Sequence, residues 1–381
     1  MRIAFNATAL LSPLTGIGQY CRHLALGLLN SQDIEANFFY GAFWNKAVRD
    51  APMPGAVKLF PWLRNNMPFS YALRRIVQNH RFAAQAKKQR FDIYHEPNIL
   101  PLSHDGLTIV TVHDLSWIRY PQAHPVQRIR AMNKYFESGL HRASLILTDS
   151  EFVKQELMEL CGIESERIRA VPLGVEKLFR PQSSEAIFET LSLYGLVHGQ
   201  YLLAVGTLEP RKNLQVALRA FSQLAPDIRK RYPLVLVGMK GWLNSELEKQ
   251  MAPLICAGQV RLLGYVSREQ LAAIIAGALT LIYPSIYEGF GLPPLEAMAS
   301  GVPVIASQAA SIPEVVGDTG ILIHPHDDKA LADAIQQLIS SPELREQLAR
   351  KARARSLRFS WEGCVEQTID TYRQLLKGKS F

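Results

Sequence analysis

The 381-residue sequence has no run approaching the roughly 20 apolar residues that a membrane-spanning helix needs, so no such helix is expected. Its four cysteines are scattered without the spacing of metal ligands, which is typical of reduced thiols in a cytosolic protein. The first residues, MRIAFNATALLSPLTG, are broken by Asn6, Pro13 and Gly16 and do not resemble a signal peptide. Low-complexity tracts and fixed-period repeats are also lacking. What is left is an ordinary globular chain, long enough for two domains.

Acidic residues are scarce in the first part of the chain. Residues 1–150 contain 17 Lys or Arg against 9 Asp or Glu, an excess of 8, whereas the other 231 residues carry 25 of each. The whole formal net charge of +8 therefore lies in residues 1–150.

Basic residues are concentrated in residues 51–91, which contain no acidic residue. They are Lys58, Arg64, Arg74, Arg75, Arg81, Lys87, Lys88 and Arg90. Phe60, Trp62 and Tyr71 lie among them, and basic heads beside aromatic anchors are typical of proteins that bind an anionic membrane surface. A charge run is equally typical of a solvated surface, so both interpretations stay open. Nucleic acid is a weaker alternative, because no recognised binding module accompanies the charge.

Short apolar runs rich in β-branched residues alternate with longer amphipathic segments along the chain, which predicts parallel sheets covered by helices. The expected strands are residues 2–7, 36–42, 91–95, 107–113, 144–149 and 168–174, followed by 200–206, 232–238, 260–264, 279–285, 302–307 and 320–325. The expected helices are residues 18–30, 69–89, 124–141 and 151–161, followed by 213–224, 243–254, 267–277, 292–300 and a helical run from 327 onward. The predicted fold class is α/β, with two Rossmann-like, doubly wound domains.

A segment without periodicity, residues 172–185, separates the two series of strands, and we place the interdomain linker there. The expected domains are residues 1–175 and 176–360. Doubly wound sheets bind ligands at the carboxyl ends of their strands, and paired domains bind them in the cleft between the domains. Which ligand is bound must be argued from the residues at those ends, because fold alone does not decide function.

Two glutamates, Glu288 and Glu296, stand eight residues apart in YEGFGLPPLEAMASG, residues 287–301. Glu288 follows an expected strand and therefore lies at the carboxyl edge of the sheet. Residues 289–291 and the helix start beyond them offer backbone N–H groups to an anion, most naturally a phosphate. A carboxylate repels phosphate but suits sugar hydroxyls, so the spacing fits a nucleotide sugar, with Glu296 in the first helical turn. The alternative for Glu296 is a glutamate favoured there only by the helix dipole.

Three further segments place candidate residues at strand ends. Arg211 and Lys212 directly precede an expected helix, where cations are unfavourable unless an anion shares the site; two solvated loop charges are the alternative. His113 follows the strand in TIVTVHDLSW and is expected to face the cleft, although a structural histidine is equally typical there. Gly16 and Gly18 link the first strand to the first helix, and Gly-x-Gly permits a close backbone approach to a substrate.

Together these segments resemble one family. The Glu288–Glu296 loop is similar to the Glu-x7-Glu motif of retaining glycosyltransferases with the GT-B fold, family GT4. VGTLEPRKN, VPLGV, TDSEFVKQEL and PSIYEGFGLPPLEAMASG also resemble members of that family. The resemblance spans nearly the whole chain, is weakest over residues 31–90, and points to bacterial polysaccharide mannosyltransferases. Thr207 and Leu173 depart from it, since some members carry arginine and asparagine there, and the first departure leaves Arg211 and Lys212 as the main phosphate clamp.

The resemblance implies a role for each candidate residue. Lys212 and Arg211 would neutralise the departing diphosphate, Glu288 would hold hydroxyls of the donor sugar, and His113 would contact that sugar from the first domain. Glu296 would hold the ribose. The other expected donor-binding residues are Gly16, Gly18 and Gly206, Tyr265 and Val266 at the base, Phe290, and Gly291 and Leu292 as backbone donors.

The same resemblance implies that residues 361–381 pack back on the first domain and that the domains close over the donor. The chain has no Asp-x-Asp, so the metal-clamped diphosphate of the other large glycosyltransferase fold is not expected, and neither a metal nor a cofactor is predicted. No residue is nominated as a covalent nucleophile.

The implied reaction transfers mannose from GDP-mannose, with retention, to a lipid-linked (polyprenyl diphosphate) oligosaccharide in lipopolysaccharide O-antigen or related polysaccharide assembly. GDP-D-rhamnose and UDP-sugars are alternative donors, and a nucleotide-sugar epimerase or a non-catalytic scaffold are alternative functions. The expected partners are the nucleotide sugar, the acceptor, an anionic membrane surface and other glycosyltransferases of the pathway, with no nucleic acid. The expected location is the cytoplasm, peripheral to the inner face of the cytoplasmic membrane.

Overall fold

The chain forms two compact units in a computed structural model that describes residues 1–12, 15–49, 70–239, 241 and 245–378. Unit 1 comprises Met1–Leu115, Pro125–Leu173 and Trp361–Phe381, and unit 2 comprises Ser116–His124 and Gly174–Ser360. The short segment Ser116–His124 thus groups with unit 2, whereas the sequence placed it in the first domain. Residues 51–69 of the basic stretch lie outside the described residues.

Unit 1 is built on a seven-stranded sheet with the order β3-β2-β1-β4-β5-β6-β7. Its strands are β1 (Arg2–Asn6), β2 (Glu35–Phe39), β3 (Trp44–Asn45), β4 (Ile93–Glu96), β5 (Leu107–Val112), β6 (Leu145–Thr148) and β7 (Ile168–Ala170). Neighbouring strands pair in parallel except β3, an antiparallel edge strand that the sequence pattern missed because two residues carry no periodicity. The chain reverses its direction of winding between β1 and β4, which is where such sheets bind ligands.

Unit 2 repeats this architecture with a six-stranded parallel sheet in the order β10-β9-β8-β11-β12-β13. Its strands are β8 (Leu202–Val205), β9 (Leu234–Val237), β10 (Val260–Gly264), β11 (Thr280–Tyr283), β12 (Val304–Ser307) and β13 (Ile321–Ile323). Strands β9, β11 and β12 are buried along their whole length, and β8 along all but its last residue, which is why they read as continuous apolar runs and not as alternating patterns. The winding reverses between β8 and β11.

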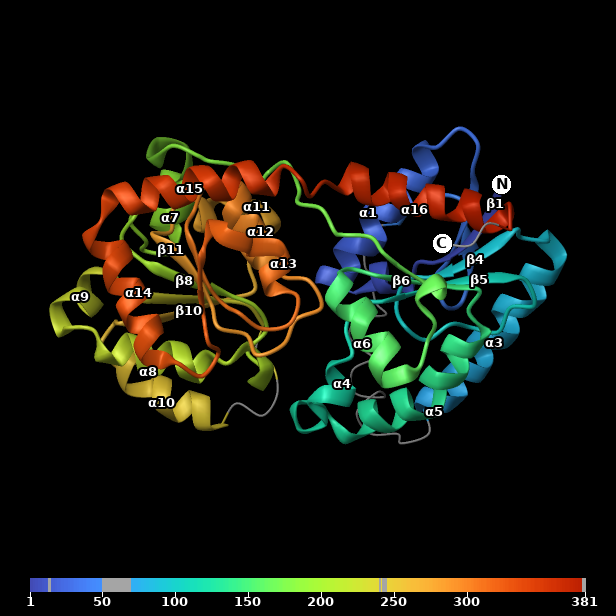
Figure 1. The fold of residues 1–381 in the computed structure, drawn as a ribbon, viewed down its shortest axis with the longest axis horizontal. Coiled ribbons are helices and arrows are strands. Elements are labelled where there is room, and N and C mark those ends of the chain that lie inside the picture. Colours follow the sequence, from blue (N-terminus) through green and yellow to red (C-terminus); the bar gives the residue numbers. More distant parts are fainter. Residues whose placement is uncertain (13–14, 50–69, 240, 242–244, 379–381) are drawn as a thin grey trace. The chain divides into compact units, whose positions relative to one another are not determined.

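Helices cover both faces of each sheet (Figure 1). In unit 1 they are α1 (Gly16–Asn30), α3 (Ser70–Gln89), α5 (Val126–Arg142), α6 (Glu151–Cys161) and α16 (Trp361–Leu376). In unit 2 they are α4 (Ser116–Arg119), α7 (Ser184–Leu193), α8 (Leu214–Gln223), α9 (Pro226–Arg231), α10 (Ser245–Cys256), α11 (Arg268–Ala276), α12 (Leu292–Ala299), α13 (Ile312–Val316), α14 (Asp328–Ser340) and α15 (Pro342–Ser356). The predicted α/β class with two doubly wound units is confirmed, while the helices α4, α7, α9 and α13 were not expected.

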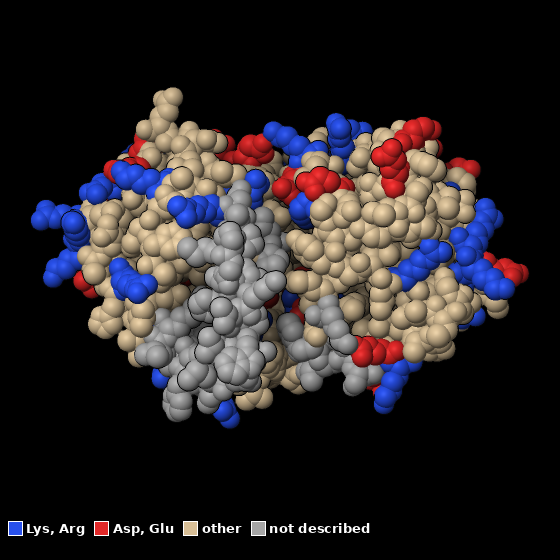
Figure 2. Space-filling view, turned by 180° about the vertical axis from the view of Figure 1, so that it is seen from behind, with Lys and Arg blue, Asp and Glu red and all other residues tan. Residues whose placement is uncertain are grey.

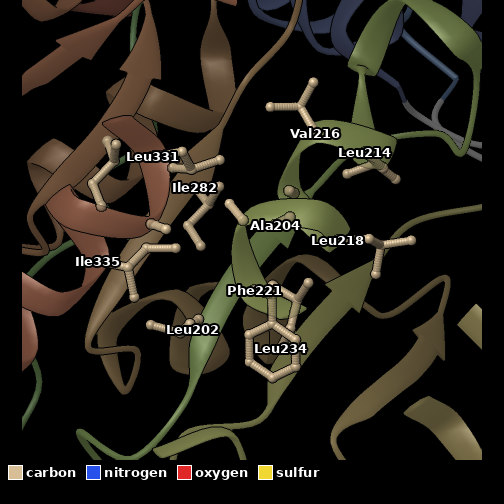
Figure 3. Close-up of a cluster of buried hydrophobic side chains, with 14 of the residues drawn as sticks. Leu202, Ala204, Leu214, Val216, Leu218, Phe221, Leu234, Ile282, Leu331 and Ile335 are labelled. Atoms are coloured by element: carbon tan, nitrogen blue, oxygen red, sulfur yellow. The ribbon is translucent and has the colours of Figure 1, made fainter. Parts of the chain in front are cut away.

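The core of unit 2 shows how these elements hold the sheet in place. Strands β8, β9 and β11 contribute leucine and isoleucine side chains that meet α8 and α14 on one face (Figure 3). Phe221 of α8 belongs to this cluster and has no exposed surface. Burying a side chain of this size stabilises the fold by about 1.5–3 kcal/mol, so the strand ends that carry the site are anchored by a rigid layer beneath them.

The last helix, α16, belongs to unit 1 and packs against α1. The ring of His23 on α1 stacks on Trp361, with centroids 4.4 Å apart. The hydroxyl of Tyr372 lies 2.6 Å from Nδ1 of His95 in the sheet, and Nε2 of His95 lies 2.8 Å from Oγ1 of Thr111. These contacts fasten the end of the described chain to the middle of the first sheet. None of the helices in the described part of the chain is both long enough and apolar enough to span a bilayer.

Candidate active site

Two loops of unit 2 meet at its topological switch point, one after β8 and one after β11. The β8 loop turns at Gly206, whose φ of 147° suits glycine and where a Cβ would lie only 3.3 Å from Cε of Lys212. It then forms a 3₁₀ turn, Pro210–Lys212, that leads into α8. The absence of a side chain at Gly206 therefore gives the Lys212 side chain room to lie across the end of β8.

The carboxylate of Glu288 joins the two loops. Its Oε1 accepts a hydrogen bond from Nζ of Lys212 at 2.6 Å, and its Oε2 accepts one from Nη1 of Arg211 at 2.9 Å. Nη1 of Arg211 also donates to the carbonyl of Tyr287 at 3.1 Å, and its Nε lies 2.6 Å from Oε1 of Glu209. The structure thus brings together three of the four predicted catalytic residues, with Glu209 as an additional carboxylate that the sequence reasoning missed.

The charge state of this cluster follows from burial and pairing. Burial alone would raise the pKa of Glu288, but the adjacent Lys212 and Arg211 cations outweigh it and hold that pKa at about 2. Glu288 is therefore a carboxylate at any physiological pH. The side chain of Lys212 is 12% exposed, and its ammonium donates a second hydrogen bond, at 3.1 Å, to the hydroxyl of Tyr283. An ammonium has three donors, so beyond these two bonds to described residues a third donor is available for a ligand.

The β11 loop is fixed from several sides. The backbone N–H of Ile286 donates to the carbonyl of Arg211 at 2.9 Å, and Nδ2 of Asn213 donates to the carbonyl of Pro284 at 3.0 Å. On the other side, Oγ of Ser311 donates to the carbonyls of Glu288 and Phe290 at 2.8 and 2.9 Å. These bonds, all made within the protein, fix the loop and the charged groups that it carries, which is the preorganisation that an electrostatic site needs.

The start of α12 offers fewer donors than the sequence suggested. Gly291 is the N-cap with φ of 119°, and Leu292 is the first helical residue. Pro293 and Pro294 follow and have no N–H, so the donors available at this helix start reduce chiefly to the backbone N–H groups of Gly291 and Leu292. The ring of Phe290 is buried and lies edge-on to Phe359, which makes Phe290 a packing residue of this loop.

Glu296 is the fifth residue of α12 and lies just beyond the first turn, in which it was expected. The first turn of α12 contains no acidic residue, which contradicts both the predicted first-turn position and the dipole-only alternative for Glu296. Its side chain is buried, and its Oε1 accepts a hydrogen bond from Nη1 of Arg268 at 2.9 Å. Sequence reasoning missed Arg268, although a cation at the first residue of a helix is the same signal that drew attention to Arg211.

The two residues expected near the base follow β10. Tyr265 is 58% exposed, whereas Val266 is buried. Both precede Ser267, which caps α11 in a capping box with Gln270. The exposed ring of Tyr265 is accessible for stacking against a base. The contact of Tyr265 and Val266 with the base stays a prediction.

His113 lies at the end of β5 in unit 1. Its Nδ1 is 2.8 Å from Oδ2 of Asp149, and its Nε2 is 2.8 Å from the carbonyl of Pro97. Both partners are acceptors, so both ring nitrogens must carry protons. Burial opposes the charge, but Asp149 and the Pro97 carbonyl outweigh it and raise the pKa of His113. Both nitrogens are engaged, so the predicted contact with a sugar would have to replace the bond to Pro97 or use the ring edge.

The glycines of the first loop differ in their surroundings. The helix α1 begins at Gly16, two residues earlier than expected, so Gly16 and Gly18 are helical. Gly16 is exposed and Gly18 is buried. Their predicted approach to a substrate stays a prediction.

A buried carboxyl group that the sequence did not single out lies at the switch point of unit 1. Oε2 of Glu96, at the end of β4, accepts hydrogen bonds from Nδ2 of Asn6 and the hydroxyl of Tyr94, each at 2.6 Å. Its Oε1 accepts one from the backbone N–H of Asn98 at 3.1 Å. Burial raises the pKa of Glu96 to about 7, although these three hydrogen bonds oppose the rise. Glu96 thus ties the end of β1 to the end of β4.

Two parallel-sheet units, with paired cations and carboxylates on the loops after β8 and β11 of the second, define a glycosyltransferase of the GT-B fold. The description "Glycosyl transferases group 1" matches residues 197–355, and "Glycosyltransferase Family 4" matches residues 14–177. The O-antigen chain mannosyltransferase B of Escherichia coli is 36% identical over 384 residues, which cover 98% of this chain and 100% of that protein. The chain belongs to glycosyltransferase family 4.

Further relatives match parts of the chain or its fold. The serotype-specific mannosyltransferase WbdA of Escherichia coli is 29% identical over 71% of this chain and 34% of its own length. Among solved structures, sucrose-phosphate synthase from Thermosynechococcus elongatus superposes with a TM-score of 0.78 at 23% identity over 100% of both chains. WaaG, a glycosyltransferase involved in lipopolysaccharide biosynthesis, superposes with a TM-score of 0.70 at 16% identity over 97% of this chain and 99% of its own. These two structures bear on the fold alone.

The buried Glu96 predicts how stability depends on pH. The folded protein holds the Glu96 proton up to about pH 7, whereas an unfolded glutamate loses it near 4.5. The contribution of Glu96 to the free energy of unfolding is therefore full below pH 4.5 and is lost as the pH rises through 7. The change amounts to about 3 kcal/mol for this group. We expect Glu96→Gln to flatten the fall in thermal unfolding temperature between pH 5 and pH 8. Glu137→Gln, at an exposed glutamate of unit 1, is the control; equal pH profiles for wild type and Glu96→Gln would contradict this assignment.

Proposed function

We propose that the protein transfers mannose from GDP-mannose, with retention of anomeric configuration, to a lipid-linked oligosaccharide in O-antigen assembly. The observation that carries the proposal is the Lys212–Glu288–Arg211 cluster at the switch point of unit 2, which combines cations for a diphosphate with a carboxylate for sugar hydroxyls. Full-length similarity to an O-antigen mannosyltransferase favours mannose over other hexoses.

Lys212 and Arg211 would act on the leaving group, the nucleoside diphosphate. Breaking the bond between C1 of the sugar and the phosphate oxygen places negative charge on the diphosphate, and fixed cations in a buried site stabilise that charge without reorganising. Lys212 and Arg211 are held in place by Glu288 and Glu209 before the donor arrives. The backbone N–H groups of Gly291 and Leu292 add neutral donors.

The sugar side of the reaction follows from the carboxylates. Glu288 stays ionised and can accept hydrogen bonds from donor-sugar hydroxyls, while Glu296 accepts them from the ribose. As C1 passes through an oxocarbenium-like state, an acceptor hydroxyl oxygen forms the new bond to C1 and its proton passes to the leaving phosphate. No metal takes part in this scheme, so activity should persist after treatment with EDTA.

The proposal is tested by the release of nucleoside diphosphate from the purified protein. GDP-mannose, GDP-D-rhamnose and UDP-glucose would each be supplied with and without a polyprenyl diphosphate-linked oligosaccharide, in buffer with EDTA. We expect GDP release from GDP-mannose only when the acceptor is present. Release from another donor would correct the sugar or base. Interconversion of free nucleotide sugars without acceptor would indicate an epimerase, and tight GDP binding without turnover of any donor would favour a scaffold.

Lys212→Ala and Glu288→Ala should each lower turnover by at least about 100-fold, the loss typical of removing a group that stabilises transition-state charge. Lys329→Ala, at an exposed lysine of unit 2, is the matched control and should leave turnover unchanged. The readout is the initial rate of GDP release at saturating GDP-mannose. Rates near wild type for both Lys212→Ala and Glu288→Ala would remove this cluster from the mechanism.

We also propose that the basic stretch binds an anionic membrane surface. The described part of that stretch is α3 and the residue after it, where Lys87, Lys88 and Arg90 are exposed and Ile76 and Val77 are 54% and 41% exposed. Basic and apolar groups on one helix suit the interface between lipid headgroups and acyl chains. Over the face drawn in Figure 2, by contrast, basic and acidic side chains are interspersed.

Binding to vesicles of phosphatidylglycerol and phosphatidylcholine should weaken as the salt concentration rises from about 50 to about 500 mM, because salt screens the attraction between the basic residues and the anionic lipids. The double variant Lys87→Glu/Lys88→Glu should bind about 10- to 100-fold more weakly, given about 1 kcal/mol for each basic residue near such a surface. Lys329→Glu/Lys351→Glu makes the same charge change on exposed residues of unit 2 and serves as the control. Salt-insensitive binding, or equal loss in both double variants, would reject the proposal.

A further inference from the structure

Arg268, the first residue of α11, lies between the half-buried carboxylate of Glu176 and the buried carboxylate of Glu296 in unit 2. Its Nη1 donates to Oε1 of Glu296 at 2.9 Å, and its Nε donates to Oε2 of Glu176 at 2.7 Å, with Nη2 donating to the same oxygen. The guanidinium carbon also lies 4.6 Å from the ring centroid of Phe179. Three elements therefore converge on this one side chain: α11, α12 and the chain segment before α7 that carries Glu176 and Phe179.

The position of this arginine is unfavourable unless it has a specific use. A cation at the first residue of a helix opposes the helix dipole. The carboxylates of Glu176 and Glu296 offset that cost, with side-chain exposures of only 12% and 6%. The planar fork of arginine can serve two carboxylates at once, which the point charge of lysine cannot do with the same geometry.

The guanidinium also determines the state of Glu296. Burial raises the pKa of this glutamate, and the charge and hydrogen bond of Arg268 oppose the rise. Arg268 occupies Oε1, and among the hydrogen bonds formed by the described residues none is donated to Oε2 of Glu296. The carboxylate is thus oriented by one oxygen and keeps acceptor capacity on the other.

We propose that Arg268 is a positioning residue that holds Glu296 as an oriented acceptor for the ribose hydroxyls of the donor nucleotide, and so determines the preference for ribose. The proposal rests on the proposed function, in which Glu296 contacts the ribose. With one guanidinium (Arg268) and two carboxylates (Glu176 and Glu296), the cluster has a net charge of −1. This charge suits neutral hydroxyl donors and would repel a further anion. The diphosphate is accordingly left to Arg211 and Lys212.

The test compares two nucleotides that differ only in the ribose hydroxyls. Dissociation constants of GDP and 2′,3′-dideoxy-GDP would be measured by calorimetry, with UDP and its dideoxy counterpart run in parallel. The proteins are wild type, Arg268→Met, Arg268→Lys and the control Arg219→Met, which removes an arginine that pairs with Asp328 at the surface of the same unit. Thermal unfolding of each variant establishes that it is folded, and Arg268→Lys keeps a positive charge if the methionine variant is unstable.

We expect wild type to bind the ribose nucleotide at least about 10-fold more tightly than the dideoxy form, as hydrogen bonds to a charged acceptor imply. Arg268→Met should weaken GDP binding about 10-fold and dideoxy-GDP binding less than about 2-fold, so that the discrimination is lost, with Arg268→Lys intermediate. Equal weakening of both nucleotides, or none, would overturn the positioning role while leaving the proposed function intact. Failure of wild type to bind either base as a diphosphate would overturn both.

Discussion

A carboxylate buried as deeply as that of Glu288 requires cations beside it, and the arrangement of the loops after β8 and β11 depends on how unit 2 meets this requirement. Removing one partner from a buried ion pair costs far more than the pair itself contributes, because a charge is left without compensation. Lys212 and Arg211 supply the compensation from a different loop, 76 and 77 residues away in sequence. The ion pairs therefore act as a joint between the end of β8 and the end of β11.

Because the ion pairs connect the two loops, the residues around them must hold both loops in a fixed geometry. Gly206 leaves space for the Lys212 stem, Asn213 ties the 3₁₀ turn to Pro284, and Ser311 holds the carbonyls on either side of the β11 loop. Each of these residues fixes backbone and contributes no charge. The charged groups thus sit on loops that behave as rigid elements, and a rigid electrostatic site is what stabilisation of a leaving diphosphate requires.

The sequence was informative where chemistry and periodicity coincide. Continuous apolar strands predicted both doubly wound units, and the cations before α8 indicated an anion site because they contradict the helix dipole. Partners distant in sequence could not be predicted: no local pattern shows that Arg268 meets Glu176 and Glu296, or that Glu96 meets Asn6. The start of α12 at residue 292 was predicted correctly, but Glu296 was wrongly counted in the first turn, since it is the fifth residue of the helix. The two-residue strand β3 carries too little pattern to be recognised.

Three glutamates at or beyond the carboxyl ends of the strands show how one residue type acquires three different states. Glu288 has two cations and a pKa of about 2, so it is a permanent carboxylate. Glu296 shares one guanidinium with Glu176, which opposes the effect of burial without reversing it. Glu96 has hydrogen-bond donors in place of an adjacent cation, and its pKa rises to about 7. Burial raises the pKa of all three, and only Glu288, with two cations in contact, has a pKa below its ordinary value. The two cations therefore separate Glu288, which can offset positive charge at every physiological pH, from Glu96, whose charge changes near neutrality.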